Sequence, residues 1–153
     1  MKRLILHVLT DYIRPMLSRP GKYQTAALCY RETSGAREVL LISSRGTGRW
    51  VIPKGNLMRG LSAAEAAATE AWEEAGVRPL SAPQPMIGEF SYLKMKRSGL
   101  PVKTTVLVFP LEVAGLEETF PEAGQRRRVW VSPQEAATMV AEPELQDILR
   151  DFA

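Results

Sequence analysis

The residues best suited to chemistry in this sequence are three glutamates, Glu70, Glu73 and Glu74. Positions i, i+3 and i+4 of a helix share one side, so the three carboxylates fall within an arc of roughly 100°. Like charges at this spacing repel one another and weaken a helix unless cations neutralise them. Hard carboxylate oxygens suit Mg²⁺ or Mn²⁺, which makes the triplet a candidate metal site. A glutamate-rich helix is also a common solvated surface, and the triplet alone leaves both interpretations open.

Other nucleophiles and metal ligands are scarce in the chain. Cys29 is the single cysteine and lies in a largely apolar run, which predicts a buried structural thiol. His7 is the single histidine and lies in the apolar N-terminal segment. These counts exclude an intramolecular disulfide and most thiol–imidazole and histidine-based zinc chemistry. We therefore expect oxygen ligands for any metal that the chain binds.

A well-marked helix carries the glutamates. Ser62 and Glu65 form a Ser-x-x-Glu capping box in front of residues 63–75, and Gly76 stands where a left-handed C-terminal cap is expected. A stripe of small residues beside the acidic arc predicts the face that packs against a sheet: Ala64, Ala68, Ala71 and Ala75. The acidic arc itself carries two more, Ala63 and Ala66. We expect this last pair to leave room for a bulky anion beside the metals.

The remaining segments predict a mixture of strands and short helices. Strand-like segments bounded by turn residues are 25–31, 38–43, 50–52, 86–95, 104–113 and 126–131. Residues 53–60 are expected to form a glycine-bearing loop. Ser132 followed by Pro133 begins another helix, and a last helix is expected over 144–152. A chain of 153 residues with 45% hydrophobic residues fits one soluble domain, and this order of elements predicts a single sandwich of the α/β or α+β class.

The N-terminal segment differs from the rest. Residues 1–20 are expected to be an extension, followed by a domain over 21–153. The apolar stretch in this extension is short, is interrupted by His7 and lacks a small-residue cleavage site, which argues against a signal peptide. No stretch approaches the ~18 apolar residues of a membrane span. We expect a cytoplasmic protein without a membrane partner, either monomeric or homodimeric.

The spacing around the glutamates matches a known motif. The Nudix box is a loop–helix–loop written G-x5-E-x7-R-E-U-x-E-E-x-G-U, where U is aliphatic. The residues that match it in type and spacing are Gly55, Glu70, Ala71, Glu73, Glu74, Gly76 and Val77. Leu61 and Thr69 depart from it, where the motif has glutamate and arginine. Those two side chains are thought to pair in the family, so their joint loss leaves no unpaired charge. The chain resembles the Nudix hydrolases, which implies an α/β/α sandwich with a mixed sheet.

This resemblance implies roles for the box residues. Glu70, Glu73 and Glu74 would bind Mg²⁺ or Mn²⁺, together with the carbonyl oxygen of Gly55. One glutamate, with Glu70 the first choice, would orient or deprotonate the attacking water. Many family members take this base from a later loop, where the candidates are Glu117, Glu118 and Glu122.

The resemblance extends over about residues 22–142, most closely to the branch that hydrolyses diphosphoinositol polyphosphates and diadenosine polyphosphates. Side chains at positions that bind phosphates in that branch are Lys22, Ser43, Arg45, Arg49, Lys54 and Arg127. Two tryptophans, Trp50 and Trp130, could stack on a nucleobase or belong to the core. If residues 126–131 form one strand, Arg126 and Arg128 point away from Arg127, so only one side of this run faces the site.

The resemblance therefore implies a magnesium-dependent pyrophosphohydrolase that cleaves a phosphoanhydride in a phosphorylated small molecule, with dinucleoside polyphosphates or diphosphoinositol polyphosphates favoured. The chain carries 20 Lys+Arg against 17 Asp+Glu, which is compatible with an anionic ligand or with solubility alone. Alternative Nudix substrates are ADP-ribose and capped RNA ends, although we do not expect nucleic acid as the partner. A third possibility is a domain that senses a polyphosphate without hydrolysing it.

Overall fold

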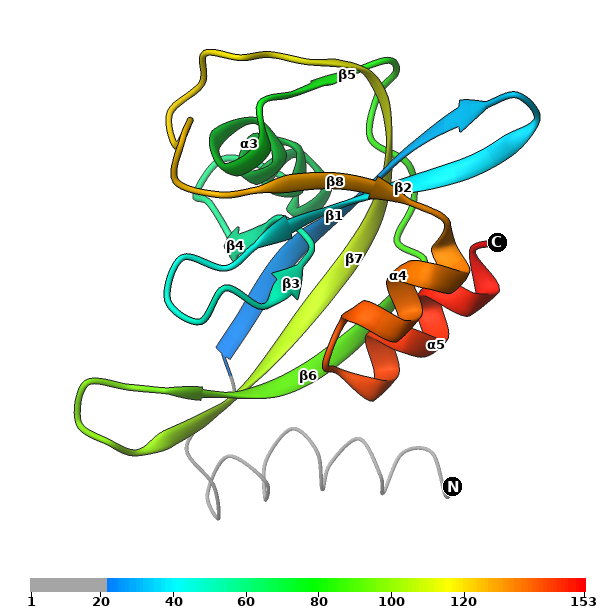
Figure 1. Ribbon diagram of the computed structural model, residues 1–153. Coiled ribbons are helices and arrows are strands. Elements are labelled where there is room, and N and C mark those ends of the chain that lie inside the picture. Colours follow the sequence, from blue (N-terminus) through cyan, green and yellow to red (C-terminus); the bar gives the residue numbers. More distant parts are fainter. Residues whose placement is uncertain (1–21) are drawn as a thin grey trace, which may run out of the picture.

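The computed structural model describes residues 22–153. Its elements follow in chain order (Figure 1): β1 (Lys22–Thr33), β2 (Ala36–Ser43), β3 (Trp50–Val51), β4 (Lys54–Asn56), α3 (Ala63–Ala75), β5 (Val77–Pro79), β6 (Gly88–Met95), β7 (Pro101–Leu116), β8 (Arg128–Val131), α4 (Pro133–Met139) and α5 (Pro143–Asp151). The expected extension over residues 1–20 lies outside the described residues. Within the described part, no helix has the length and apolar character needed to span a membrane.

The strands form one mixed sheet. Its central order is β3-β2-β1-β7-β5, with β4 added to β1, β6 to β7 and β8 to β2. β1 and β7 are parallel, with Lys22 opposite Thr104 and Tyr30 opposite Glu112. The other pairs are antiparallel. A parallel pair needs a long crossover connection, and the chain between β1 and β7 contains α3.

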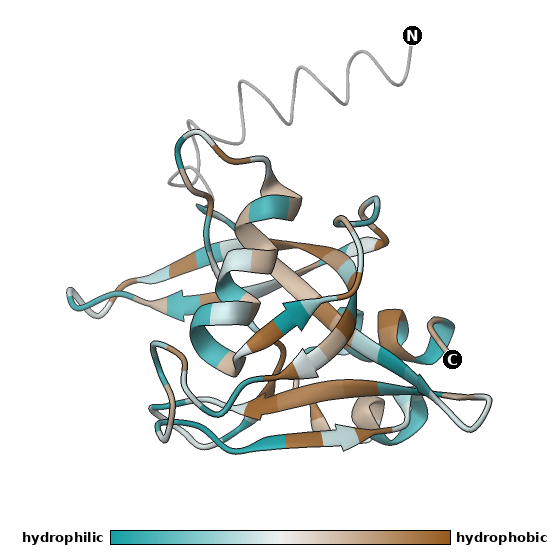
Figure 2. Cartoon of the chain, turned by 90° about the horizontal axis from the view of Figure 1, so that it is seen from above, coloured by the Kyte–Doolittle hydropathy of each residue, from teal (hydrophilic) through white to brown (hydrophobic). Residues whose placement is uncertain are grey.

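The two faces of the sheet bury separate hydrophobic cores. On β1, Ala26 and Leu28 pack with residues of α4 and α5, whereas Ala27 and Cys29 pack with the alanines of α3. One strand serves both cores because its side chains alternate between faces. The fold is therefore the predicted α/β/α sandwich, with α3 on one side and the α4–α5 pair on the other (Figure 1). Hydrophobic residues are concentrated on the strands between these layers (Figure 2).

Helix α3 begins and ends as predicted, but a different face is buried. The Ser62 hydroxyl accepts from the amide of Glu65 at 3.1 Å, and the Glu65 carboxylate accepts from the amide of Ser62 at 3.1 Å. The buried alanines are Ala66, Ala67, Ala71 and Ala75, whereas Ala64 and Ala68 are partly exposed. The buried face of α3 is therefore rotated by part of a turn from the face predicted to pack against the sheet. The burial of Ala66 also contradicts the expectation that it leaves space for an anion.

Two short strands, β4 and β5, were not predicted from the sequence. Residues 53–60 were expected to be a loop, yet Gly55 of β4 pairs with Thr25 of β1, and the amide of Ala27 donates to the carbonyl oxygen of Pro53 at 3.0 Å. β5 pairs with β7 at the other edge. Both strands have three residues and contain glycine or proline, so neither shows the alternation by which strands are recognised. The predicted strands are present, with β7 longer and β8 beginning at Arg128 instead of residue 126.

Candidate active site

A cavity of about 570 Å³ opens where α3, β4 and the loop before β8 meet. Its polar lining residues are Gln24, Ser44, Arg45, Arg49, Lys54, Asn56, Glu70, Glu74, Tyr92, Lys94, Glu122, Arg126 and Glu142. Acidic and basic side chains therefore face the same space. Such a mixture suits a ligand that is anionic and reaches the protein together with a cation.

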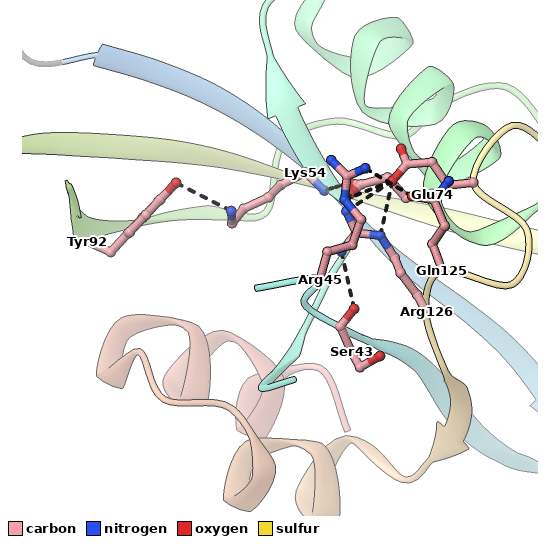
Figure 3. Close-up of polar contacts among 8 residues, drawn as sticks. Ser43, Arg45, Lys54, Glu74, Tyr92, Gln125 and Arg126 are labelled. Carbon is pink, nitrogen blue, oxygen red and sulfur yellow. Dashed lines mark hydrogen bonds and ion pairs between the residues drawn. The ribbon is translucent and has the colours of Figure 1, made fainter. Parts of the chain in front are cut away.

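Glu74 is the most firmly held carboxylate of the cavity. The backbone amide of Lys54 donates to Oε1 at 3.0 Å, and Nη2 of Arg126 lies 2.9 Å from Oε2. The side chains of Arg126 and Glu74 are only 10% and 8% exposed. Burial raises the pKa of the Glu74 carboxyl, while Arg126 and the hydrogen bond from Lys54 oppose that rise. Figure 3 shows Arg126 pointing toward Glu74, and the side chain of Lys54 extending away from it toward Tyr92.

Glu70 lies beside three other carboxylates, whose effect the charge of Arg126 opposes only in part. Burial, followed by the charges of Glu74, Glu73 and Glu122, raises the pKa of the Glu70 carboxyl to about 7. A nearby divalent cation would reverse this effect by stabilising the ionised form. Gly55 approaches the same carboxylate so closely that a β-carbon at this position would overlap it. The absence of a side chain at residue 55 therefore gives Glu70 its place beside the β4 backbone.

We expect Gly55→Ala to destabilise the protein by about 1–3 kcal/mol, the usual cost of forcing extra volume into a packed site. The added methyl group must displace Glu70 or the β4 backbone that pairs with β1. Gly46→Ala is the matched control, because a β-carbon there would meet nothing within 4 Å. The measurement is the free energy of unfolding in urea. Equal values for the two variants would contradict the close approach.

The donor set fits a hard divalent cation, although the side chains are not yet arranged around one. Glu70 and Glu74 line the cavity with the Gly55 backbone, whereas Glu73 does not line it. Within residues 22–153, no three acidic groups lie close enough together to coordinate one ion as they stand. Coordination of one ion by all three glutamates would therefore require side-chain movement, and a bound cation would favour the ionised form of Glu70.

The residues predicted to bind phosphate fall into two groups. Arg45, Arg49 and Lys54 line the cavity. The other three do not, for different reasons. Lys22 is exposed at the start of β1, the buried Ser43 accepts a hydrogen bond from the Arg127 amide at 2.8 Å, and the Arg127 guanidinium lies over the Trp50 ring at 4.9 Å.

Arg126, and not Arg127, is the residue of the basic run that reaches the cavity. The expected alternation does not apply because β8 begins only at Arg128. Nη2 of Arg126 also lies 3.3 Å from Glu122, and Nη1 donates to the Ser43 carbonyl oxygen at 3.2 Å. Arg126 is therefore a buried cation that joins two elements of the site.

Of the three candidate bases in the later loop, the structure brings one to the cavity. Glu122 lines it and pairs with Arg126 and Arg45. Glu117 pairs instead with Arg78 at 2.7 Å, and Glu118 is 93% exposed. The sequence analysis missed Gln24, Tyr92 and Glu142, which come from three separate elements and share no local motif.

Comparison with known proteins agrees with this geometry. The NUDIX domain family matches residues 22–152. The chain belongs to this family. Among relatives, the Nudix hydrolase 17, mitochondrial, of Arabidopsis thaliana is 35% identical over 99 residues, which cover 65% of this chain and 52% of that protein. The Nudix hydrolase 21, chloroplastic, of the same plant is 34% identical over 129 residues, covering 80% and 61%. This Nudix chain thus spans only 52% and 61% of the length of these two relatives.

Solved structures show the same Nudix fold. A binary complex of the Ap4A hydrolase of C. elegans has a TM-score of 0.63 and 21% identity, with 86% of this chain and 94% of that chain covered. The NUDIX domain of NrtR from Shewanella oneidensis, complexed with ADP ribose, has a TM-score of 0.64 and 14% identity, with 96% of each chain covered. At such identities the likeness concerns the fold and not the substrate.

Proposed function

We propose that this Nudix domain is a pyrophosphohydrolase that uses Mg²⁺ or Mn²⁺ to cleave a phosphoanhydride, with dinucleoside polyphosphates or diphosphoinositol polyphosphates as favoured substrates. The observation that carries the proposal is one cavity lined by Glu70 and Glu74 together with Arg45, Arg49 and Lys54. Carboxylates can hold the cation, and the basic side chains can bind several phosphates at once.

In the proposed reaction, the acidic residues bind the cation and the basic residues bind the phosphates. Glu70, Glu74 and the Gly55 carbonyl would hold the cation, with Glu73 joining after a side-chain rotation. A divalent ion in this position supplies Lewis-acid polarisation of the phosphate and activation of water. Arg45, Arg49 and Lys54 orient the phosphate chain and neutralise the charge that develops on it.

A carboxylate oxygen of Glu70 is the first choice to accept the proton of the attacking water. Glu70 lines the cavity beside Glu74 and the Gly55 backbone, so its carboxylate lies next to the groups that would hold the cation and its bound water. Glu122 is the second choice, because it lines the same cavity. Its pairing with the buried Arg126 makes it the less mobile of the two.

Two other functions compete with this proposal. Hydrolysis of ADP-ribose or of capped RNA ends would use the same chemistry on a different substrate, and the structurally similar NrtR domain is complexed with ADP ribose. A domain that senses polyphosphate without turnover would have no need of an activated water. The acidic cavity favours hydrolysis over sensing.

The test is phosphate release from a panel of phosphoanhydrides, with and without Mg²⁺. We expect kcat/KM for diadenosine hexaphosphate or a diphosphoinositol to exceed that for ATP and ADP-ribose by about tenfold or more. KM for the best substrate should rise with salt, because the Debye length falls from about 30 Å at 0.01 M to about 8 Å at 0.15 M.

Two variants test whether the basic side chains of the cavity bind the phosphates of the substrate. Arg49→Ala should raise KM more than it lowers kcat, whereas Arg59→Ala removes an equal charge outside the cavity and should change neither. A preference of about tenfold for ADP-ribose or ATP would reject the polyphosphate substrates. Absence of Mg²⁺-dependent release from every substrate would reject hydrolysis.

A further inference from the structure

The cavity continues beyond the glutamates of α3 to a second group of polar side chains. We call this the distal end, formed by Gln24, Lys54, Tyr92 and Glu142. Nζ of Lys54 reaches it from the β4 side and lies 3.4 Å from the Tyr92 hydroxyl (Figure 3). Glu142 reaches it from the start of α5, which is fixed to β6 because the Glu144 carboxylate accepts from the amide of Ser91 at 2.9 Å.

Glu142 is unusual among the buried polar groups. It stands at the N-cap of α5, yet its side chain makes no capping hydrogen bond. Its Oε2 is buried and accepts no hydrogen bond from the part of the chain that the structure describes. Buried acceptors nearly always have a partner, because the loss of water is otherwise uncompensated. The carboxylate is therefore an acceptor that a ligand in the cavity can satisfy.

Two neighbouring side chains already hydrogen-bond to other residues of the distal end. The Tyr92 hydroxyl donates to Oε1 of Gln24 at 2.8 Å, and the Lys54 ammonium group donates to that same hydroxyl oxygen. Lys54 is also flanked by two carboxylates, Glu74 and Glu142, whose charges both act on it. These carboxylates offset part of the Lys54 charge, whereas the charges of Arg126 and Arg49 act in the opposite sense. Lys94 also lines the cavity, but Oε2 of Glu142 remains without a donor among the described residues.

The favoured substrates differ in what they bring to such an acceptor. A nucleoside carries ribose hydroxyls and base N–H groups, all of which donate hydrogen bonds. A fully phosphorylated inositol ring has no free ring hydroxyl and no N–H group, and it carries several negative charges. A carboxylate stabilises the first by hydrogen bonding and repels the second, and the repulsion is strongest where little water screens it.

We propose that Glu142 is a specificity-determining residue that accepts a hydrogen bond from a nucleoside end group and excludes a phosphorylated inositol ring from the distal end. The inference rests on the proposed function for the chemistry at α3, but concerns only what occupies the opposite end of the cavity. Of the two favoured substrate classes, the role of Glu142 predicts that the dinucleoside polyphosphates bind more tightly than the diphosphoinositol polyphosphates.

The experiment is calorimetric binding of diadenosine tetraphosphate and of a diphosphoinositol pentakisphosphate to the full chain, with a chelator present so that no turnover occurs. The unaltered protein should bind the dinucleotide at least about tenfold more tightly. Glu142→Gln keeps the shape and should narrow this ratio, whereas Glu142→Lys should shift it toward the diphosphoinositol by about tenfold or more. Thermal unfolding of each variant verifies that it folds.

Asp147→Asn is the matched control. It removes one negative charge from the same helix at a side chain that is 74% exposed and lies outside the cavity, so it should leave the ratio within about twofold. The inference is overturned if the unaltered protein binds the diphosphoinositol more tightly or binds neither compound, or if neither Glu142 variant changes the ratio. If the two compounds bind in the expected ratio but the unaltered protein releases no phosphate from any substrate in the presence of Mg²⁺, only the hydrolase proposal is rejected.

Discussion

Glu70→Gln and Glu74→Gln should each lower kcat by about 10²-fold or more, a loss typical of removing one group that stabilises the transition state. Glutamine keeps the shape of the side chain but removes the charge that would hold the cation. The affinity for Mn²⁺, measured by calorimetry, should weaken in both variants, because both carboxylates are expected to hold the ion. A fall in kcat with unchanged Mn²⁺ affinity would instead indicate loss of the base. The assays are turnover of the best substrate and the Mn²⁺ titration.

Two comparison variants make this prediction specific. Glu117→Gln removes a carboxylate that pairs with Arg78 outside the cavity and should retain full activity. Glu73→Gln tests a side chain that does not line the cavity, and an equal loss there would show that Glu73 rotates inward when the ion binds. Full activity in a Glu70→Gln and Glu74→Gln double variant would refute the metal assignment.

Arg126→Ala should destabilise the protein by about 3–5 kcal/mol, the usual cost of removing one partner of a buried ion pair. Arg126 and Glu74 are almost completely shielded from water, and Arg126 also pairs with Glu122. Its removal leaves the buried Glu74 without its paired cation and leaves Glu122 paired only with the exposed Arg45. The surface variant Arg150→Ala, which breaks an exposed pair with Asp147, should cost no more than about 1 kcal/mol.

The effect of Arg126→Ala should also depend on pH. Burial already raises the pKa of the Glu74 carboxyl, and Arg126 opposes that rise, so losing Arg126 raises the pKa further. A carboxyl whose pKa is higher in the folded than in the unfolded state destabilises the fold. This destabilisation is complete above the folded-state pKa and absent below the unfolded-state pKa. The difference in unfolding free energy from the unaltered protein should therefore shrink as the pH falls through the folded-state pKa values of Glu74, which lie above the unfolded value of about 4.3. A difference that stays constant with pH, or an effect no larger than that of Arg150→Ala, would contradict the role of Arg126.

Local patterns in the sequence were sufficient to predict the central helix and most strands. Ser62 with Glu65 marks the start of the thirteen-residue helix α3, and Gly76 marks its end. Both caps are present in the structure as predicted. The largely apolar run over residues 25–31, bounded by turn residues, likewise predicted the first strand. β4 and β5 escaped prediction because their partners are distant in the sequence and their own residues carry no periodic signal.

The candidate site was predictable only where the motif covers it. The box located Glu70, Glu74 and Gly55. Arg126 enters the cavity in place of Arg127 because both precede the start of β8 at Arg128, so strand alternation does not set their directions. Glu142 and Tyr92 are brought together by the packing of α5 against β6. No spacing rule connects residues from elements so far apart, so only the tertiary structure could reveal them.

The pairing of β4 with β1 has a consequence for the affinity of the site. Residues 54–56 are fixed by backbone hydrogen bonds in the folded protein, so their conformational freedom is lost during folding and not when a ligand arrives. Fixing one residue's backbone costs about 1–2 kcal/mol. A flexible loop would subtract that entropy from every binding event at Gly55 and Lys54. Here the loss falls on the stability of the fold, and the ligand meets a surface that is already ordered.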